Sequence, residues 1–223
     1  MRTSVRTDSS LLDADRAKAL ALTPVSRETI KRLDRFVALL IAWQNRTNLI
    51  AASSASHLWT RHIADSLQLL ALAPAAGRDW VDIGSGAGFP GLVIACALAE
   101  IPGSMVHLVE SNAKKAAFLR EAQRATESPA MVHAERMERF AQRFGGKVDV
   151  VCARAVAPLK SLLELSFPLL ERTGALALLL KGRNAELELS EARSLWRMDA
   201  TLVESRTDPS GRIIAIRSVH KQE

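Results

Sequence analysis

The segment VDIGSGAGFPG, residues 81–91, is the part of the sequence best suited to bind a reactive small molecule. It follows a short apolar run and precedes a helical pattern, which is the setting of a nucleotide-binding loop. Glycine tolerates positive φ and leaves no Cβ between the backbone and a ligand. Open α/β sheets bind ligands at the carboxyl ends of their strands, where this loop would lie. The segment therefore predicts a nucleotide or nucleoside site.

Two glycine spacings overlap in this segment, and they suggest different cofactors. Gly86, Gly88 and Gly91 form G-x-G-x-x-G, which suits a dinucleotide pyrophosphate. Asp82, followed by glycines from Gly84 onward, forms the acidic-x-G-x-G-x-G pattern of S-adenosylmethionine enzymes. We favour the second, because Gly84 directly follows the strand and the tight turn would start there. Asp82 could hydrogen-bond within the loop or, through water, to a cationic methionine moiety, whereas its charge would not help beside a pyrophosphate.

Two further segments could complete a nucleoside site. Glu110 ends the strand-like run VHLVE and could accept hydrogen bonds from ribose hydroxyls, or it could cap the helix that follows. The segment AERME, residues 134–138, comes after the next strand. Its backbone could read the edge of an adenine and Met137 could pack on the adenine face, or the segment could be a plain exposed helix start.

The loop after the fourth strand offers little acid–base chemistry. Residues 148–158 lack the Asn/Asp-Pro-Pro-aromatic tetrad of enzymes that methylate exocyclic amino groups. Cys152 lies in an apolar run, which is a poor setting for a reactive thiolate. Guanine N7 carries a lone pair and no proton, so methyl transfer to it needs alignment more than a base. Arg154 could position a phosphate or the cofactor carboxylate, or form a surface salt bridge with Asp149 or Glu164.

Two polar clusters elsewhere are weaker candidates. The segment RHIADS, residues 61–66, places His62 one helical turn from Asp65 or Ser66. It could be a substrate-facing cluster or a solvated helix face, and from the spacing alone we favour the solvated face. The segment KGR, residues 181–183, ends the fifth strand and could bind RNA phosphate or be an ordinary basic turn. The five histidines show no metal-ligand spacing, so we predict no metal site.

The elements that must hold these groups divide the chain into two parts. Residues 1–78 show helical patterns without a strand, and we expect helices at 11–22, from 26 to about 45–48, and from 56 to about 72. Residues 79–223 alternate short apolar runs with helical patterns, which indicates βαβ units. We expect a Rossmann-like α/β methyltransferase domain, with helices on both faces of a mostly parallel sheet, preceded by an N-terminal helical extension packed on this core.

The expected strands lie at 80–83, 105–109, 131–133, 148–153 and 175–180. The expected helices between them lie at 91–99, 114–126, 135–142 and 159–170. The last two apolar runs, 200–205 and 213–218, flank the turn-forming sequence DPSG and could form a hairpin at the sheet edge.

The composition is that of a globular protein with a basic balance. The chain has 223 residues, 48% of them hydrophobic, and no apolar run long enough for a membrane span. Its polar N-terminus lacks the apolar centre of a secretory signal, and its two cysteines, Cys96 and Cys152, favour a reduced cytoplasmic protein. The net charge of +6 favours a nucleic-acid partner, although a merely soluble basic enzyme fits as well. Nothing in the sequence demands more than a monomer.

These segments together resemble the bacterial 16S ribosomal RNA guanine-N7 methyltransferases, the glucose-inhibited division protein B family. The resemblance covers residues 36–216, and its most specific part is DIGSGAGFPG at 82–91, where Phe-Pro-Gly after the glycines is a family feature. The supporting residues are Trp43, Asn48-Leu49, Arg61-His62, Asp65-Ser66, Glu110-Ser111, Lys114-Lys115, Phe118-Leu119, Arg154-Ala155 and Leu180-Lys181-Gly182. Gln44, Thr47 and Ile50 depart from the usual Asn, Tyr and Thr.

The resemblance implies methyl transfer from S-adenosyl-L-methionine to N7 of the guanine conventionally numbered 527, in 16S rRNA or a precursor of the small ribosomal subunit. By the same resemblance, the cofactor contacts fall on Gly84, Phe89, Met137, Glu138 and Arg154. The residue patterns by themselves add Gly86 and Glu110 to this site. They leave open a methyltransferase that acts on small molecules, an oxidoreductase that uses a nicotinamide cofactor, and an RNA-binding module without activity.

Overall fold

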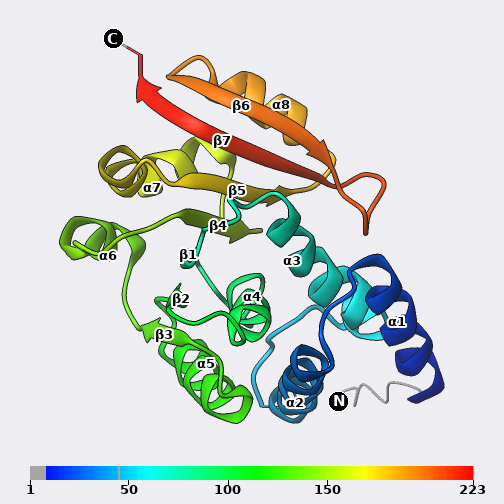
Figure 1. The fold of residues 1–223 in the computed structure, drawn as a ribbon. Coiled ribbons are helices and arrows are strands. Elements are labelled where there is room, and N and C mark those ends of the chain that lie inside the picture. Colours follow the sequence, from blue (N-terminus) through cyan, green and yellow to red (C-terminus); the bar gives the residue numbers. More distant parts are fainter. Residues whose placement is uncertain (1–8, 45, 223) are drawn as a thin grey trace.

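The computed structural model describes residues 9–44 and 46–222. Its N-terminal part begins with helix α1 (Ser9–Leu22) and helix α2 (Arg27–Gln44), as the spacing of apolar residues predicts (Figure 1). The Ser26 hydroxyl accepts a hydrogen bond from the Thr29 backbone N–H at 3.0 Å, so it caps the start of α2. The inward stripe of α2, which includes Leu33, Phe36 and Leu40, is buried.

An irregular helical segment follows, where the sequence predicts one regular helix. It consists of 3-10 helix η1 (Ala52–His57), π-helical turn η2 (Trp59–Ala64), α3 (Asp65–Leu67) and 3-10 helix η3 (Gln68–Ala71). The buried carboxylate of Asp15 in α1 accepts hydrogen bonds from the backbone N–H groups of Trp59 at 2.8 Å and Thr60 at 3.2 Å. Asp15 thereby satisfies free donors at the start of the π turn and fixes α1 against it.

The remainder of the chain forms one seven-stranded sheet in the order β3-β2-β1-β4-β5-β7-β6. Strands β1 to β5 pair in parallel, whereas β7 lies antiparallel between β5 and β6. The mostly parallel sheet and the terminal hairpin at its edge are confirmed. The strands are β1 (Asp79–Ile83), β2 (Met105–Val109), β3 (Ala130–His133), β4 (Val150–Arg154), β5 (Leu176–Lys181), β6 (Trp196–Glu204) and β7 (Arg212–Lys221).

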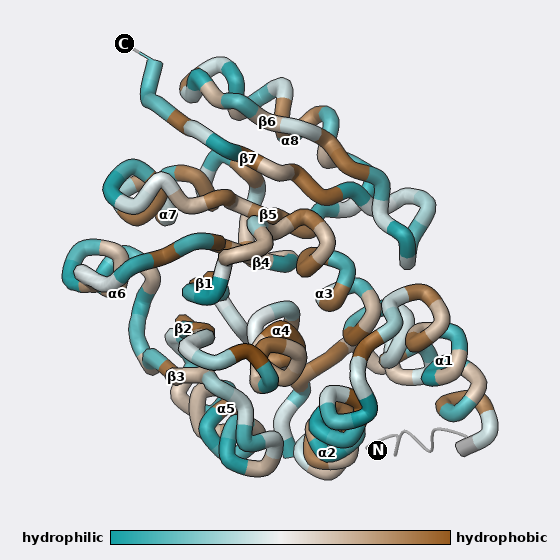
Figure 2. The backbone as a smooth tube through the Cα atoms, viewed as in Figure 1, coloured by the Kyte–Doolittle hydropathy of each residue, from teal (hydrophilic) through white to brown (hydrophobic). Residues whose placement is uncertain are grey.

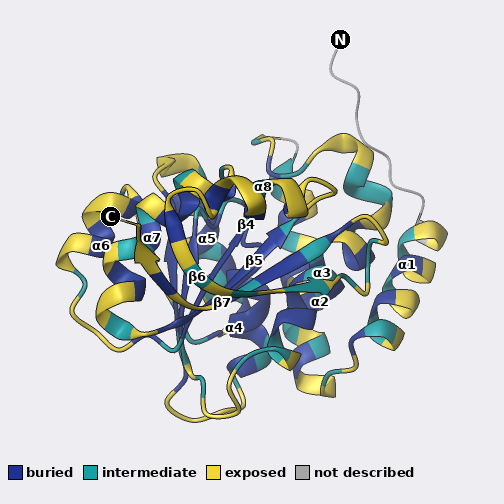
Figure 3. Ribbon diagram, turned by 90° about the horizontal axis from the view of Figure 1, so that it is seen from above, coloured by how far each residue is buried: buried dark blue, intermediate teal, exposed yellow. Residues whose placement is uncertain are grey.

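Helices cover both faces of this sheet. The buried side chains of the central strands point alternately to one face and to the other, so both faces are apolar. On one face α4 (Gly91–Leu98) and α5 (Ala113–Thr126) share an apolar core with α1, α2 and the irregular segment. On the other face lie α6 (Met137–Arg143), α7 (Leu159–Thr173) and α8 (Ala185–Ala192). Helix α8 is absent from the elements predicted above. Figure 2 shows α4 as a strongly apolar stretch, and Figure 3 shows the central strands β4 and β5 buried between the helical layers.

The N-terminal helices pack on the core, since α2 contacts α4 and α5. The proposed boundary at residue 78 stays a prediction. Within the described part of the chain, no helix is long and apolar enough to cross a membrane. Cys96 and Cys152 are free and buried, as expected of small apolar side chains.

Candidate functional site

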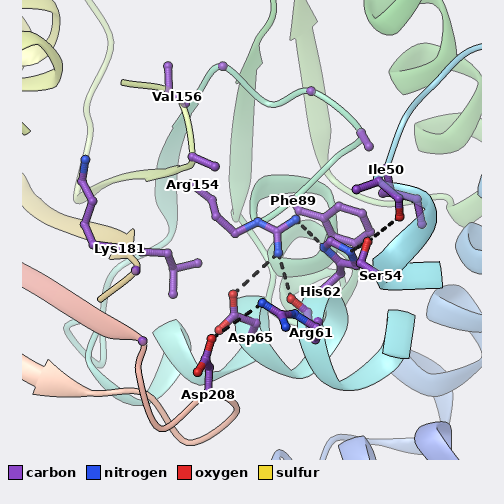
Figure 4. A pocket seen from close by; sticks show the side chains of 18 of the residues that line it. Ile50, Ser54, Arg61, His62, Asp65, Phe89, Arg154, Val156, Lys181 and Asp208 are labelled. Atoms are coloured by element: carbon purple, nitrogen blue, oxygen red, sulfur yellow. Dashed lines mark hydrogen bonds and ion pairs between the residues drawn. The ribbon is translucent and has the colours of Figure 1, made fainter. Parts of the chain in front are cut away.

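A cleft of about 920 Å³ opens at the carboxyl ends of β1, β4 and β5. One wall is the glycine loop after β1, and the loops that follow β4 and β5 form the floor. The opposite wall comes from the irregular helical segment and the turn between β6 and β7 (Figure 4). Side chains that face the cleft from these elements include Ser54, Arg61, His62, Asp65, Phe89, Arg154, Lys181, Thr207 and Asp208.

The glycine loop adopts the left-handed backbone that its sequence predicts. Gly84, Gly86 and Gly88 have φ of 65°, 53° and 92°. A Cβ on Gly86 would meet only the Gly84 carbonyl oxygen at 3.7 Å, so this residue faces open space in the cleft. A Cβ on Gly84 would lie 2.8 Å from a methyl group of Val156. Gly84 therefore accommodates both the tight turn and the close approach of the loop after β4.

Asp82 stabilises this loop from the protein interior and does not line the cleft. Its side chain is fully buried and accepts a hydrogen bond from the Gly91 N–H at 3.1 Å. Burial raises the pKa of Asp82 to about 7, against the opposing effect of its hydrogen bonds. Of the two roles considered for Asp82, the structure shows hydrogen bonding within the loop. Because β1 ends at Ile83, the turn starts at Gly84, as the S-adenosylmethionine pattern requires.

Glu110 ties the end of β2 to the glycine loop. Its carboxylate accepts hydrogen bonds from the backbone N–H groups of Gly86 at 2.9 Å and Asn112 at 2.7 Å. Capping of α5 falls to the Asn112 side chain, which accepts from the N–H groups of Lys114 and Lys115. Glu110 itself is 8% exposed and does not line the cleft.

Four of the seven predicted site residues come together in the cleft, and three do not. The four that line it are Gly84, Gly86, Phe89 and Arg154. Met137 and Glu138 lie in the first turn of α6, where Met137 is buried in the core and Glu138 is exposed. With Glu110, they are absent from the lining of this cleft.

The environment of Arg154 differs from the alternative considered for it, a surface salt bridge with Asp149 or Glu164. Its guanidinium lies 3.6 Å from the carboxylate of Asp65 and donates to the Arg61 carbonyl oxygen at 2.9 Å. The Cζ atom lies 5.0 Å from the centre of the Phe89 ring. Burial lowers the pKa of Arg154, and the charge of Asp65 opposes this shift. Arg154 is thus fixed in the middle of the cleft.

The interpretation of the segment 61–66 as a solvated helix face is wrong. His62 in the π-helical turn and Asp65 at the start of α3 both line the cleft, where His62 stacks on Phe89 with ring centres 4.8 Å apart. Asp65 accepts a hydrogen bond from the Thr207 hydroxyl at 2.7 Å, and burial raises the pKa of its carboxyl. Helical spacing alone could not identify this face as buried, because the covering residues lie far away in the sequence.

Lys181 is not free to bind an RNA phosphate, in contrast to one reading of the segment 181–183. Its Nζ donates to the Ala157 carbonyl oxygen at 2.6 Å and to the Glu188 carboxylate at 2.8 Å. The same carboxylate accepts from the Leu159 N–H at 2.7 Å. Lys181 and Glu188 together hold the loop after β4, in which Ala155 has a φ of 52°.

The turn between β6 and β7 contributes residues that sequence reasoning missed. Asp208 lies 3.7 Å from the Arg61 guanidinium, and the Gln68 side-chain oxygen accepts from the Arg206 N–H at 2.9 Å. The sequence DPSG correctly indicates a turn there. No local signal shows that this turn docks on the irregular helical segment and closes the cleft.

The cleft is suited to positioning and poorly suited to proton transfer or covalent catalysis. Burial raises the pKa of the Cys152 thiol well above its usual range. Burial and the charges of Arg154 and Arg61 lower the pKa of His62 to about 3. Among residues 9–44 and 46–222, no cluster of side chains could hold a metal ion. A reaction here has to rely on alignment and electrostatics.

Solved structures share this fold at low sequence identity. Cofactor-bound Rv0187 from MTB aligns with a TM-score of 0.62 and 14% identity, over 94% of this chain and 98% of that one. A mutant of MtNAS in complex with S-adenosylmethionine aligns with a TM-score of 0.54 and 14% identity, over 95% of this chain and 80% of that one. These two likenesses confirm the Rossmann-like α/β fold.

Sequence relatives are much closer. A protein of Bradyrhizobium sp. (strain BTAi1) named ribosomal RNA small subunit methyltransferase G is 56% identical over 220 residues, which is 99% of this chain and 98% of the relative. A protein of Nitrobacter hamburgensis with the same name is 54% identical over 96% of this chain and 82% of its own length. The GidB family model, described as rRNA small subunit methyltransferase G, matches residues 29–212. The chain therefore belongs to the rRNA small subunit methyltransferase G family.

Proposed function

We propose that this protein transfers a methyl group from S-adenosyl-L-methionine to N7 of guanine 527 in 16S rRNA. The main support for this proposal is the arrangement of side chains in the cleft. The cleft combines an open left-handed glycine loop with a largely buried arginine, and the side chains in it that could act as bases have a lowered pKa or are already paired. Such a site suits an acceptor atom that has a free lone pair and no proton to lose.

The residues that line the cleft fit S-adenosyl-L-methionine. Gly86 leaves open space where a Cβ would otherwise stand, which supports close approach of the ligand to the backbone. Phe89 offers an aromatic face, and Arg154 offers a charge for the carboxylate of the methionine moiety. When bound, the cofactor supplies a methyl group activated by a cationic sulfonium.

The adenosyl end of the ligand is assigned to the residues that lie beyond the cleft lining. Each oxygen of Glu110 accepts one backbone hydrogen bond and keeps a lone pair for a ribose hydroxyl. Met137 and Glu138, at the start of α6, are proposed to contact the adenine, as the family resemblance implies. A Glu110→Gln variant tests this assignment separately. The variant should bind S-adenosylhomocysteine more weakly than wild type does, and it should bind a methionine analogue without a nucleoside with unchanged affinity.

The other side chains in the cleft are arranged for alignment. His62 has a pKa lowered to about 3, Asp65 pairs with Arg154, and Glu188 is engaged by Lys181. Each of these groups is therefore poorly available as a general base. Methyl transfer to guanine N7 needs in-line placement of donor and acceptor, and afterwards the base carries the positive charge. The proposed substrate also places the enzyme in the cytoplasm.

The decisive experiment uses small ribosomal subunits and free 16S rRNA from a bacterium that lacks this gene. Each is incubated with the purified protein and labelled S-adenosyl-L-methionine, and the methylated base is mapped by chemical cleavage at 7-methylguanine. We expect one new cleavage site, at guanine 527, and weaker transfer as salt rises. Methylation of a different atom, or turnover on small molecules without RNA, would contradict the proposal.

A further inference from the structure

The imidazole of His62 joins the two walls of the cleft at one point. Its Nδ1 lies 2.6 Å from a guanidinium nitrogen of Arg154, and its Nε2 lies 2.9 Å from the Ser54 hydroxyl. Its ring stacks on Phe89 at an interplanar angle of 26°. Figure 4 shows these side chains converging on the centre of the cleft. His62 thus contacts two of the residues assigned above to ligand binding.

The hydrogen-bond partners of His62 determine its tautomer from both sides. A guanidinium has donors and no acceptor, so Nδ1 has to accept the hydrogen bond from Arg154. The Ser54 hydroxyl donates its proton to the Ala51 carbonyl oxygen at 2.8 Å, so it accepts from Nε2–H. The proton therefore lies on Nε2. A protonated imidazole would lose the hydrogen bond to Arg154 and place two positive charges in contact.

We propose that His62 is a positioning residue of the methyl-transfer site, in which the neutral Nε2–H imidazole, through its hydrogen bond, holds the Arg154 guanidinium in the arrangement that receives the ligand. The inference rests on the proposed function, because Arg154 and Phe89 are the ligand contacts. It assigns a role in the site to the N-terminal helical part, which lies outside the sheet and its loops.

The surroundings of His62 keep it neutral across the physiological range. Arg154 and Arg61 both place positive charge near the ring, and with burial they lower the pKa of His62 to about 3. Phe89 covers one face of the ring, and the carboxylate of Asp65 pairs with Arg154 at 3.6 Å. No change of ambient pH between 5 and 8 should release the hydrogen bond to Arg154.

Two variants separate the hydrogen bond of His62 from its ring stacking. His62→Asn places a carbonyl oxygen near the position of Nδ1, so it can still accept from Arg154. His62→Phe keeps a ring against Phe89 and removes the acceptor. His220→Asn, on the exposed end of β7, is the matched control. A hydrogen bond to a charged group typically contributes enough for a change of about 10- to 100-fold in affinity.

The test combines nuclear magnetic resonance and calorimetry on the full chain. Two-bond ¹H–¹⁵N correlations of histidine-labelled protein, with the His62 signal assigned by its loss in His62→Phe, should show the Nε2–H tautomer from pH 8 to pH 5. Calorimetric titration with S-adenosylhomocysteine should give affinities within about threefold of wild type for His62→Asn and His220→Asn. It should give about 10- to 100-fold weaker binding for His62→Phe.

The outcomes distinguish this inference from the proposed function. An Nδ1–H tautomer or an imidazolium at pH 6 would overturn the role of His62, as would wild-type affinity in a folded His62→Phe variant. If His62→Phe does not fold, weak binding by a folded His62→Asn variant would overturn it, and the tautomer assignment would use His62→Asn instead. Failure of wild-type protein to bind S-adenosylhomocysteine would overturn the cofactor assignment and with it the positioning role.

Discussion

The two walls of the cleft are built in different ways. The glycine loop wall comes from consecutive residues, 84–89, at the end of one strand. The opposite wall, here called the distal wall, consists of Ser54, Arg61, His62 and Asp65 from the irregular helical segment and of Thr207 and Asp208 from the β6–β7 turn. Its contact between Asp65 and Thr207 joins residues 142 positions apart.

This difference determines what each wall contributes. Backbone conformation shapes the glycine loop wall, so the wall depends on φ values that only glycine adopts at little cost. Polar side chains, most of them partly buried, pair with one another across the distal wall, so this wall depends on long-range folding. The first wall provides space for a ligand, and the second orients the charged group that faces that space. Each prediction below changes one wall and leaves the other intact.

The largest effect is expected from Gly84→Ala on the glycine loop wall. The new Cβ would lie 2.8 Å from Val156, in addition to the strain of a left-handed backbone. We expect about 100-fold weaker binding of S-adenosylhomocysteine, or about 2.8 kcal/mol, measured by calorimetry. Gly174→Ala is the matched control, because Gly174 has a φ of 64° and open space around its Cβ position.

Both glycine variants should lose at least about 1–2 kcal/mol of unfolding free energy in urea, because both force alanine into a left-handed conformation, and the contact with Val156 adds to the loss for Gly84→Ala. Only Gly84→Ala should lose affinity. Equal affinities for the two variants would show that the loop after β4 adjusts freely and that the glycine loop wall does not limit binding.

The next largest effect is expected from Asp65→Ala on the distal wall. The change removes the partner of a largely buried guanidinium and the acceptor of the Thr207 hydroxyl. Loss of one member of a buried ion pair is strongly destabilising, and partial exposure of both side chains reduces the cost here to about 2 kcal/mol. Urea unfolding measures this change.

Arg61→Ala is the control for the distal wall, because its ion pair with Asp208 at 3.7 Å is exposed. Such a pair contributes about 0–1 kcal/mol. A smaller loss for Asp65→Ala than for Arg61→Ala would mean that the distal wall is not organised around Arg154.

The effect of pH through His62 is smaller than the two preceding ones when it is expressed per pH unit. Its folded-state pKa of about 3 lies below the ordinary value of 6.5, so the unfolded chain binds a proton there that the folded chain does not. Stability from this group is therefore complete above pH 6.5 and falls as pH decreases toward 3. The loss attributable to His62 is about 1.4 kcal/mol per pH unit within this window.

The comparison with His62→Asn isolates this contribution, since His107, whose pKa is lowered to about 4, titrates in both proteins. Urea unfolding at pH 6.5, 5.5 and 4.5 should show a steeper loss of stability in wild type than in the variant. Parallel pH dependences would mean that His62 is accessible to protons in the folded state.

Features that depend on a short stretch of sequence could be predicted from the sequence. The glycine spacing after an apolar run located the β1 turn, and the alternation of runs and helices predicted the parallel sheet. Helix α8 was not predicted, because its acidic first turn, with Glu186 and Glu188, shows little apolar periodicity. Residues 56–72, predicted as one regular helix, form an irregular segment. Asp15 in α1 and the β6–β7 turn both hydrogen-bond to this segment.

The distal wall could not be predicted for a related reason. His62 and Asp65 have the spacing of a solvated face, and their burial depends on Arg154 and on Thr207, which join them only in the folded chain. Lys181 looked like a phosphate ligand because its partners, Ala157 and Glu188, are not visible as a pattern in the sequence. The spacing of residues in the sequence can reveal a binding loop formed by the backbone. Contacts between side chains that are distant in the sequence can be recognised only in the folded structure.

The most direct test of the account is a crystal structure of the protein with S-adenosylhomocysteine. The account predicts the ligand in the cleft between the two walls, with its carboxylate toward Arg154 and its sulfur region beside the open face of Gly86. The ligand bound elsewhere, or no ligand in the cleft of crystals saturated with it, would contradict it.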